Sequence, residues 1–155
     1  MSINLLTDFF GFPRSFKIPA EVEQRFDNGS LCEKCGRCCH GSIHYKGILV
    51  MLPELPCKYL NRINENMAVC SVYDDRGRFA KWCQRVSRES IGNGLFPADC
   101  PYTRGIEGYQ GKAVLPDDEQ KKFYEWLKKM FTGQPRPEYL KESDWNNFLA
   151  RLGIE

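Results

Sequence analysis

Four of the eight cysteines of this 155-residue chain lie within eight positions, in the segment LCEKCGRCCHG. A C-x2-C turn brings two sulfurs within reach of one metal ion and leaves the intervening backbone amides free to hydrogen-bond the thiolates. Gly36 lies inside the turn, where a residue without a side chain permits tight backbone geometry. The spacing therefore predicts metal ligation by a CxxCxxCC cluster. Its members are Cys32, Cys35, Cys38 and Cys39.

The other four cysteines are spread along the following part of the chain, with 12 to 16 residues between neighbours. Tertiary folding can bring residues at such spacings to the CxxCxxCC turn. The last of them precedes Pro101, and a cysteine-proline pair also completes the bacterial ferredoxin run. Eight thiols satisfy two tetrathiolate sites, which fits one four-iron cluster plus one zinc ion, or two zinc ions. These four cysteines are Cys57, Cys70, Cys83 and Cys100.

Cys38 and Cys39 are adjacent, and neighbouring side chains of an extended chain point in opposite directions. We therefore expect them to serve different metals, or one of them to bind metal while the other bridges or only contacts a ligand. His40 and His44 would point the same way in an extended segment, so joint ligation is one option. The other is a hydrogen-bonding role beside the site, because the thiols alone suffice as ligands.

The charge balance gives no electrostatic argument for a nucleic-acid partner. The chain has 22 basic and 20 acidic residues and a formal net charge of +2, whereas nucleic-acid binding favours a strongly basic face. With two zinc ions, eight thiolates (−8) and the metals (+4) would move the charge from +2 to −2. Basic residues near the cysteines either offset this charge or are ordinary solvated side chains. They are Lys34, Arg37, Lys46 and Lys58.

The N-terminal sequence lacks the pattern of an export signal. No basic residue precedes its apolar run, Asp8 interrupts that run, and Gly11 and Pro13 follow soon after. No window approaches the ~20 apolar residues of a membrane span. We therefore expect a cytoplasmic protein without a membrane partner, in a compartment that keeps thiols reduced. The alternative is a disulfide framework, for which eight cysteines allow about 105 pairings.

The predicted elements indicate an α+β fold, with a small cysteine-rich, metal-centred domain, much irregular structure and a helical C-terminal region. The clearest helix follows Pro116, because Phe123, Leu127 and Phe131 recur at helical spacing. We expect one domain over residues 1–155, with a metal-binding core at about 30–105 and a helical buttress at about 116–153. The expected elements are helices at 19–29, 82–91, 116–133 and 143–152, strands at 47–52 and 67–73, and an ordered loop at 96–116.

The cysteine pattern resembles the CxxCxxCC cysteine-cluster family, also called YkgJ-type zinc- or iron-chelating proteins. Beyond the CEKCGRCC core, the likeness includes a C-x-x-L sequence at Cys57, a C-x-x-Y sequence at Cys70 and a later Cys83. It covers residues 32 to about 102, close to half of the chain. The combination is specific, whereas a single CxxC would not be.

The resemblance implies metal binding through these cysteines, with an iron–sulfur cluster or zinc ions as the cofactor. Cys100 fits the family pattern less closely than the other cysteines do. The chain also departs from the pattern at two places. Arg76-Gly77 stands where an Arg-Pro is usual, and Gln84-Arg85-Val86 stands where a Phe-Pro is usual.

Three functions are compatible with these observations. An iron–sulfur protein with a redox role is favoured by all-cysteine ligation and the ferredoxin-like spacing. A zinc-stabilised structural or interaction module, with residues 92–116 as a surface for a protein partner, is the alternative. A metal-dependent enzyme, such as a protein methyltransferase or oxidoreductase, rests on family analogy alone. The chain has no G-x-G-x-x-G or H-E-x-x-H motif that would support an enzyme. The sequence pattern gives no indication of the oligomeric state.

Overall fold

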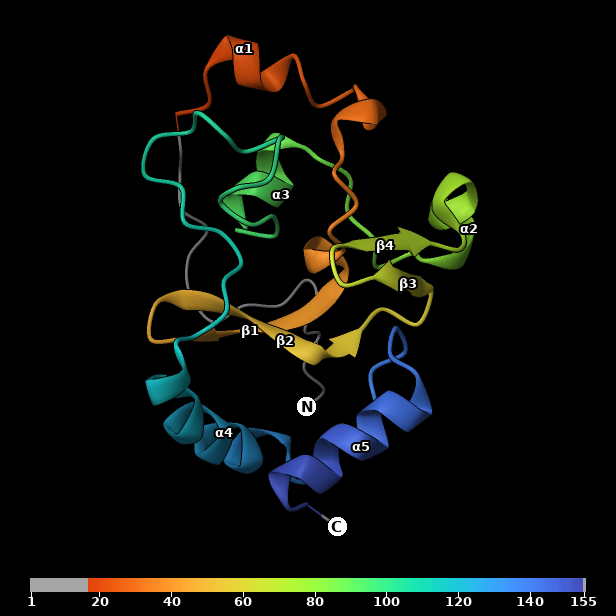
Figure 1. The fold of residues 1–155 in the computed structure, drawn as a ribbon, viewed down its shortest axis with the longest axis vertical. Helices are drawn as coiled ribbons and strands as arrows, with labels where there is room; N and C mark the ends of the chain where they lie inside the picture. The colour runs from red at the N-terminus through yellow and green to blue at the C-terminus, as the bar shows by residue number, and fades with distance from the viewer. Residues whose placement is uncertain (1–16, 155) are drawn as a thin grey trace.

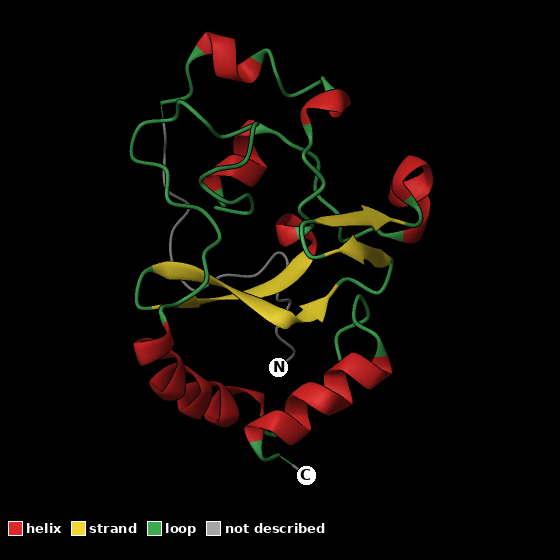
Figure 2. Ribbon diagram, in the orientation of Figure 1, coloured by secondary structure: helices red, strands yellow, loops and turns green. Residues whose placement is uncertain are grey.

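The computed structural model describes residues 17–154, and an antiparallel hairpin lies at its centre (Figure 1, Figure 2). Strand β1 (His40–Tyr45) pairs with β2 (Ile48–Pro56). They are joined by Lys46 and Gly47, whose positive φ angles of 50° and 79° suit the twist of a two-residue hairpin turn. Because β1 begins directly after Cys39, the hairpin fixes one end of the CxxCxxCC segment.

A second, smaller hairpin lies beside the first and forms a separate sheet (Figure 1). It pairs β3 (Leu60–Asn64) with β4 (Met67–Cys70). Strand β4 also contacts the cysteine segment, because the amide of Ala68 donates to the carbonyl of Lys34 at 2.7 Å. Both hairpins therefore flank the CxxCxxCC segment.

Two long helices cover one face of the central hairpin, below it in Figure 1. Helix α4 (Asp117–Phe131) has acidic residues in its first turn and lysines in its last, which suits the helix dipole. Helix α5 (Glu142–Leu152) ends at Gly153, whose left-handed φ of 78° closes it. Their apolar faces form a core with the hairpin. Its most buried members are Ile43, Leu52, Leu55, Leu127, Phe131, Leu140 and Phe148.

Short helices and long connections make up the other half of the structure, in the upper part and at the right of Figure 1. Helices α1 (Ala20–Glu23), α2 (Arg76–Phe79) and α3 (Arg88–Gly92) have four or five residues each. Helices this short are not stable by themselves, so this half depends on tertiary contacts. A second apolar cluster supplies some of them and consists of Val22, Ile91, Leu95, Phe96 and Ile106.

The structure confirms the predicted α+β class and the helical C-terminal region. The predicted helix at 82–91 is wrong, because residues 82–87 are irregular and only α3 is helical. Ser87 accounts for the break, since its backbone is extended and its hydroxyl accepts from the amide of Ser90 at 3.1 Å, which starts α3 anew. Strand β2 runs to Pro56, beyond the predicted end at residue 52, because Pro53 lies exposed where the pairing of the two strands is irregular.

The other predicted elements are present with altered ends. The helix expected at 19–29 is the single turn α1, and the strand expected at 67–73 stops at Cys70. Residues 96–116 form the expected loop, apart from isolated bridges. Helix α5 begins at Glu142, one residue before the predicted start, and no side chain caps it.

Nothing in the described part of the chain qualifies as a membrane-crossing helix, because none is both long and apolar enough. The N-terminal sequence used to argue against an export signal, residues 1–16, lies outside the described residues.

Leu127→Ala should destabilise the protein strongly, because this side chain is fully buried between α4, α5 and the central hairpin. We expect a loss of about 2–5 kcal/mol in the free energy of unfolding, measured by urea denaturation. Lys121→Ala, at an exposed position of the same helix, is the matched control and should change little. Similar losses for both variants would contradict this placement of the core.

Candidate metal centre

All eight cysteines lie within the described part of the chain, and each is a free thiol. Cys32 follows the short 3-10 helix η1 (Gly29–Leu31). The amide of Lys34 donates to the Cys32 sulfur at 3.4 Å, which is the N–H···S contact expected of a C-x2-C turn. Gly36 adopts a left-handed φ of 77° and leads into a second 3-10 helix, η2 (Arg37–Cys39). The CxxCxxCC segment therefore forms the predicted tight turn.

Cys100 comes from the long loop after α3, and its neighbours connect it to this turn. Asp99 forms an ion pair with Arg37 at 2.8 Å, which places the residue before Cys100 beside the residue before Cys38. Cys38 and Cys100 also pack against the same apolar cluster. Tertiary contacts thus bring together two cysteines that lie far apart in the sequence.

Electrostatic effects show which thiols lie close to Cys100. Burial raises the pKa of the Cys100 thiol to about 11, and the thiols of Cys38, Cys35 and Cys32 contribute to the shift. The amide of Tyr102 donates to the Cys100 sulfur and opposes it. Burial likewise raises the pKa of Cys32, with contributions from Cys38 and Cys35. The first cysteine group is therefore Cys32, Cys35, Cys38 and Cys100.

The remaining cysteines gather between the two hairpins and α2. The amide of Cys57 donates to the carbonyl of Cys39 at 2.7 Å. Cys70 ends β4 opposite Leu60, whose amide donates to the Cys57 carbonyl at 2.9 Å. Burial raises the pKa of the Cys83 thiol, and the thiols of Cys38, Cys70 and Cys57 contribute to the shift. We assign Cys39, Cys57, Cys70 and Cys83 to a second cysteine group on these contacts.

The two groups meet at Cys38 and Cys39, whose sulfurs lie 4.0 Å apart. The expectation that these side chains point in opposite directions is wrong, because η2 is helical and not extended. The Cys39 thiol donates toward the Cys38 sulfur, which lowers the pKa of Cys38 and raises that of Cys39. Cys39 is thus favoured as the neutral partner of a Cys38 thiolate.

Arginines face both cysteine groups. Arg37 hydrogen-bonds the Cys35 thiol as well as its carboxylate partner. Arg76, in α2, lies close enough to Cys83 and Cys70 that both thiols favour its charged form. Each group therefore has a guanidinium that can offset negative charge on its sulfurs.

The basic residues predicted from the sequence divide into two sets. Lys34 and Arg37 lie close to thiols of the first group, since both interact electrostatically with its sulfurs. The other two basic residues contact aromatic rings. Lys46 lies over the ring of Tyr45, and Lys58 lies over the rings of Tyr59 and Trp82.

Lys112 is a buried cation that the sequence analysis missed. Only 4% of the residue is exposed, and its Nζ donates to the carbonyls of Cys38 at 3.2 Å and His40 at 2.9 Å. Burial lowers the pKa of Lys112 to about 8, while the thiols of Cys38 and Cys39 favour its charged form. Lys112 lies in a glycine-rich loop, and nothing near it in the sequence indicates these two hydrogen bonds, because their acceptors lie 72 and 74 residues away.

The two histidines lie on β1, and His40 has a structural role. It is 4% exposed, and its Nδ1 lies 2.8 Å from the carbonyl oxygen of Gly36. Burial lowers the pKa of His40, so we assign a neutral ring whose Nδ1–H donates to this carbonyl. His44 lies further along β1, opposite Leu49. The geometry at His40 matches the hydrogen-bonding role considered above.

No three Cys, His, Asp or Glu side chains among residues 17–154 already surround a common metal position. Zinc–sulfur bonds are about 2.3 Å long, so ligation would require the sulfurs of a group to rotate inward. The thiols would lose their protons on binding, and the sulfurs of a group would share one cation.

Sequence comparison finds relatives of this chain among known proteins. Over 109 residues it is 36% identical to protein MJ1479.1 of Methanocaldococcus jannaschii, an alignment that covers 69% of this chain and 74% of that protein. The chain belongs to the family of MJ1479.1. No protein-family profile and no solved structure matches it.

Two UPF0260 proteins are also similar to this member of the MJ1479.1 family. The one from Rhodobacter capsulatus is 29% identical over 111 residues, covering 70% of this chain and 68% of that protein. The one from Photorhabdus laumondii is 30% identical over 89 residues, covering 56% and 58%. The names of these relatives state no activity, so the function has to be argued from the cysteines.

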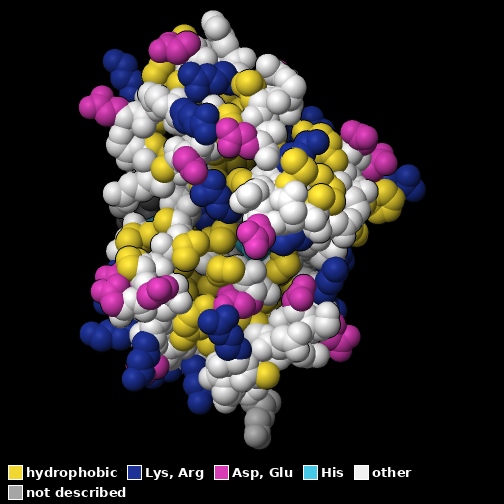
Figure 3. All heavy atoms as spheres, in the orientation of Figure 1, with side chains coloured by type: hydrophobic (Ala, Val, Ile, Leu, Met, Phe, Trp, Pro, Cys, Tyr) yellow, Lys and Arg dark blue, Asp and Glu magenta, His cyan; other side chains and the backbone are white. Residues whose placement is uncertain are grey.

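The surface outside the cysteine region offers different chemistry. Basic and acidic side chains are intermixed over the face shown in Figure 3, in agreement with the balanced composition.

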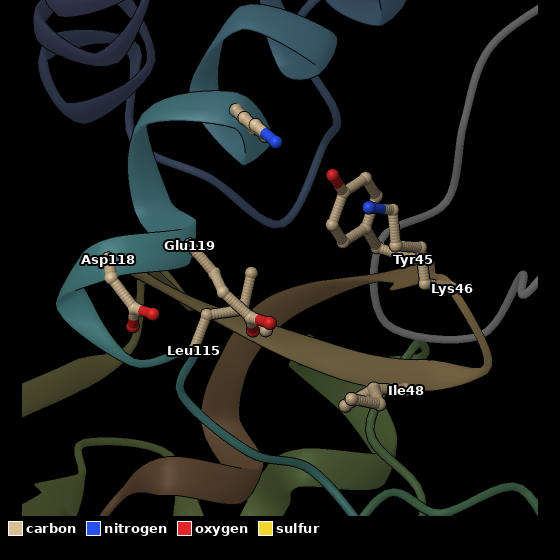
Figure 4. A pocket seen from close by; sticks show the side chains of 7 residues that line it. Tyr45, Lys46, Ile48, Leu115, Asp118 and Glu119 are labelled. Atoms are coloured by element: carbon tan, nitrogen blue, oxygen red, sulfur yellow. The ribbon is translucent and has the colours of Figure 1, made fainter.

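A pocket of about 470 Å³ lies between the β1–β2 turn and the start of α4 (Figure 4). Its lining combines apolar side chains with two lysines and two carboxylates. The lining residues are Tyr45, Lys46, Ile48, Leu115, Asp118, Glu119 and Lys122.

Gly36→Ala should destabilise the protein more than Gly47→Ala does. The φ angles are 77° and 79°, so both variants carry similar backbone strain. A Cβ at Gly36 would lie 2.9 Å from the Cβ of Ala68 and 3.3 Å from a methyl of Leu60, whereas one at Gly47 would meet nothing within 4 Å. We expect a difference of about 1–3 kcal/mol in urea denaturation. Equal losses would show that the cysteine turn does not pack against β3 and β4.

Proposed function

We propose that this protein binds metal through its CxxCxxCC cysteines, as the resemblance to the CxxCxxCC family implies, and that the bound group is an iron–sulfur cluster with a redox role. The observation that carries the proposal is the packing of the CxxCxxCC turn against segments that carry later cysteines. Asp99, beside Cys100, pairs with Arg37 at 2.8 Å, and the amide of Cys57 donates to the carbonyl of Cys39 at 2.7 Å. Burial and neighbouring thiols raise the pKa of Cys32, Cys83 and Cys100, and a bound cation would favour the thiolate form that this environment disfavours.

Contacts around the sulfurs support thiolate ligation. Cys32 accepts a hydrogen bond from the amide of Lys34, and Cys100 accepts one from the amide of Tyr102. Such bonds stabilise the anionic form that binds metal. Arg37 and Arg76 add positive charge beside the first and second cysteine groups. A tetrathiolate bound to a divalent metal has a net charge of about −2, which these cations would offset.

An iron–sulfur cluster is favoured over zinc by the ligand types and their spacing. The candidate ligands are all cysteines, and C-x2-C-x2-C with a remote Cys-Pro is the arrangement of bacterial ferredoxins. Such a cluster supplies one-electron transfer. Cys32 and Cys83 are exposed, so each group reaches the surface, as exchange of electrons with a protein partner requires.

A zinc-stabilised structural or interaction module is the second candidate. The observation that favours it is the shortness of α1, α2 and α3, which have four or five residues each. A closed tetrathiolate zinc site supplies folding free energy to segments of this kind. In that case the metal would hold residues 92–116 in place as a surface for a partner.

The experiment that tests the proposal is an ultraviolet–visible spectrum with iron, sulfide and zinc analysis on protein purified without oxygen. Broad brown absorption with iron and sulfide is the expected result. A colourless protein that contains zinc would select the structural module. A protein with neither metal, and without the capacity to take one up, would overturn metal binding altogether.

Cys35→Ser should lose bound metal and lower the thermal midpoint, because removal of a ligand removes binding free energy that is coupled to folding. Ser30→Ala, at an exposed position two residues before Cys32, is the control and should keep its bound metal and its thermal midpoint. Metal content and melting temperature are measured on the two variants side by side. An unchanged midpoint and metal content for Cys35→Ser would show that the CxxCxxCC turn is not the site.

A further inference from the structure

Resting on the proposed function, we infer that the cysteines form two separate tetrathiolate sites that meet at one point. Each site takes one metal ion or one cluster and uses a complete cysteine group. The first consists of Cys32, Cys35, Cys38 and Cys100, and the second of Cys39, Cys57, Cys70 and Cys83.

The first site is assembled by two ion pairs between the CxxCxxCC turn and the loop that carries Cys100. Arg37 pairs with Asp99 at 2.8 Å, and Glu33 pairs with Arg104 at 2.9 Å. Each pair joins residues one to four positions away from a cysteine of the first group. The two ion pairs therefore hold the loop against the turn from two sides. Within the described residues, no ion pair connects the loop that carries Cys100 to the second hairpin.

The second site is assembled by backbone pairing and ring stacking. Cys57 is hydrogen-bonded to Cys39 through its amide, as described above. Tyr59 stacks on Trp82 with ring centroids 6.0 Å apart and planes only 2° from parallel. Because these aromatic residues lie next to the cysteine segments, the stack places Cys83 beside Cys57. None of these contacts involves the loop of the first site.

Electrostatic interactions among the thiols follow this division only in part. Three members of the first group raise the pKa of Cys100, whereas the pKa of Cys83 is raised by two members of the second group and by Cys38. Cys38 is the exception, because it also affects Cys83 and Cys39. We place Cys38 in the first site because it shares an apolar cluster with Cys100 and would complete a set of four there.

Cys32→Ser and Cys83→Ser provide a matched test, because both positions are exposed and neither variant opens the core. Metal content is measured for each, followed by alkylation of free thiols under native conditions and peptide mass spectrometry. Cys32→Ser should lose one of two metals and expose Cys35, Cys38 and Cys100 to alkylation. Cys83→Ser should lose the other metal and expose the remaining members of the second group. The double variant should lose both.

The outcomes separate this inference from the proposed function. If wild-type protein binds no metal and all its thiols react, metal binding fails. If it binds metal but the two variants expose the same thiols, the division into two sites is wrong. Exposure of Cys38 in both variants would also overturn it, because this sulfur would then bridge two metals.

A different observation, the burial of Lys112, supports a second inference. No carboxylate forms an ion pair with Lys112 anywhere in residues 17–154, and two backbone carbonyls satisfy only two of its three donors. A buried ammonium needs an anionic partner, and the groups that favour its charged form are the thiols of Cys38 and Cys39. We propose that Lys112 is a positioning residue whose counter-ion is the metal–thiolate charge at the junction of Cys38 and Cys39.

Lys112→Met removes the charge and keeps most of the side-chain volume, and Lys112→Arg keeps the charge as the control. At pH 7, metal-free Lys112→Met should lose only the interactions that Lys112 makes without metal, including its two hydrogen bonds to carbonyls, so its free energy of unfolding should fall less than that of the metal-bound variant. With metal bound, the same variant should hold it roughly tenfold less tightly against a competing chelator. Lys112→Arg should retain tighter binding than Lys112→Met.

A purely structural lysine would give a different pattern. If Lys112→Met lost equal stability with and without metal, and metal affinity were unchanged, the hydrogen bonds to the two carbonyls would be its whole role. That result would overturn the second inference and leave the division into two sites standing, because the alkylation experiment does not involve Lys112.

Discussion

The cysteine half of this protein depends on a constraint on ionisation: its thiols are partly buried, and neighbouring thiols oppose one another's loss of a proton. Burial raises the pKa of Cys32, Cys83 and Cys100, and neighbouring thiols add to each shift. Arg37 and Arg76 offset part of the charge. In the proposed function a metal would complete this compensation, because it binds the thiolate form and cancels repulsion between sulfurs. It would then stabilise the half of the structure in which regular elements are short.

The other half is stabilised by apolar packing, and the central hairpin connects the two. Leu127 and Phe148 are buried against the hairpin face that α4 and α5 cover. At the end of β2, Cys57 bridges Leu140, and the amide of Lys58 donates to the carbonyl of Tyr139 at 2.7 Å. The segment before α5 therefore supports a cysteine of the second group directly. Packing of the C-terminal helices and placement of that sulfur are linked through this contact.

Features that depend on neighbours in the sequence were predicted well. The N–H···S contact at Cys32 and the left-handed Gly36 follow from the C-x2-C-G spacing. Helix α4 follows from the spacing of its apolar residues. Local competition explains the errors: Ser87 caps α3 and interrupts the expected helix, and the helical turn at η2 brings the sulfurs of Cys38 and Cys39 together.

Residue types and their spacing were enough to predict the candidate metal ligands, the turn that presents the first of them, and the amphipathic helices at the C-terminus. Each of these depends on interactions within about four residues, which spacing fixes directly. Three features emerge only from the folded chain: Cys100 lies near Cys32, Arg76 faces the second group, and Lys112 contacts the junction of the two groups. Those contacts join segments dozens of residues apart, and ion pairs and apolar packing between hairpins and loops select them. No local pattern encodes that selection.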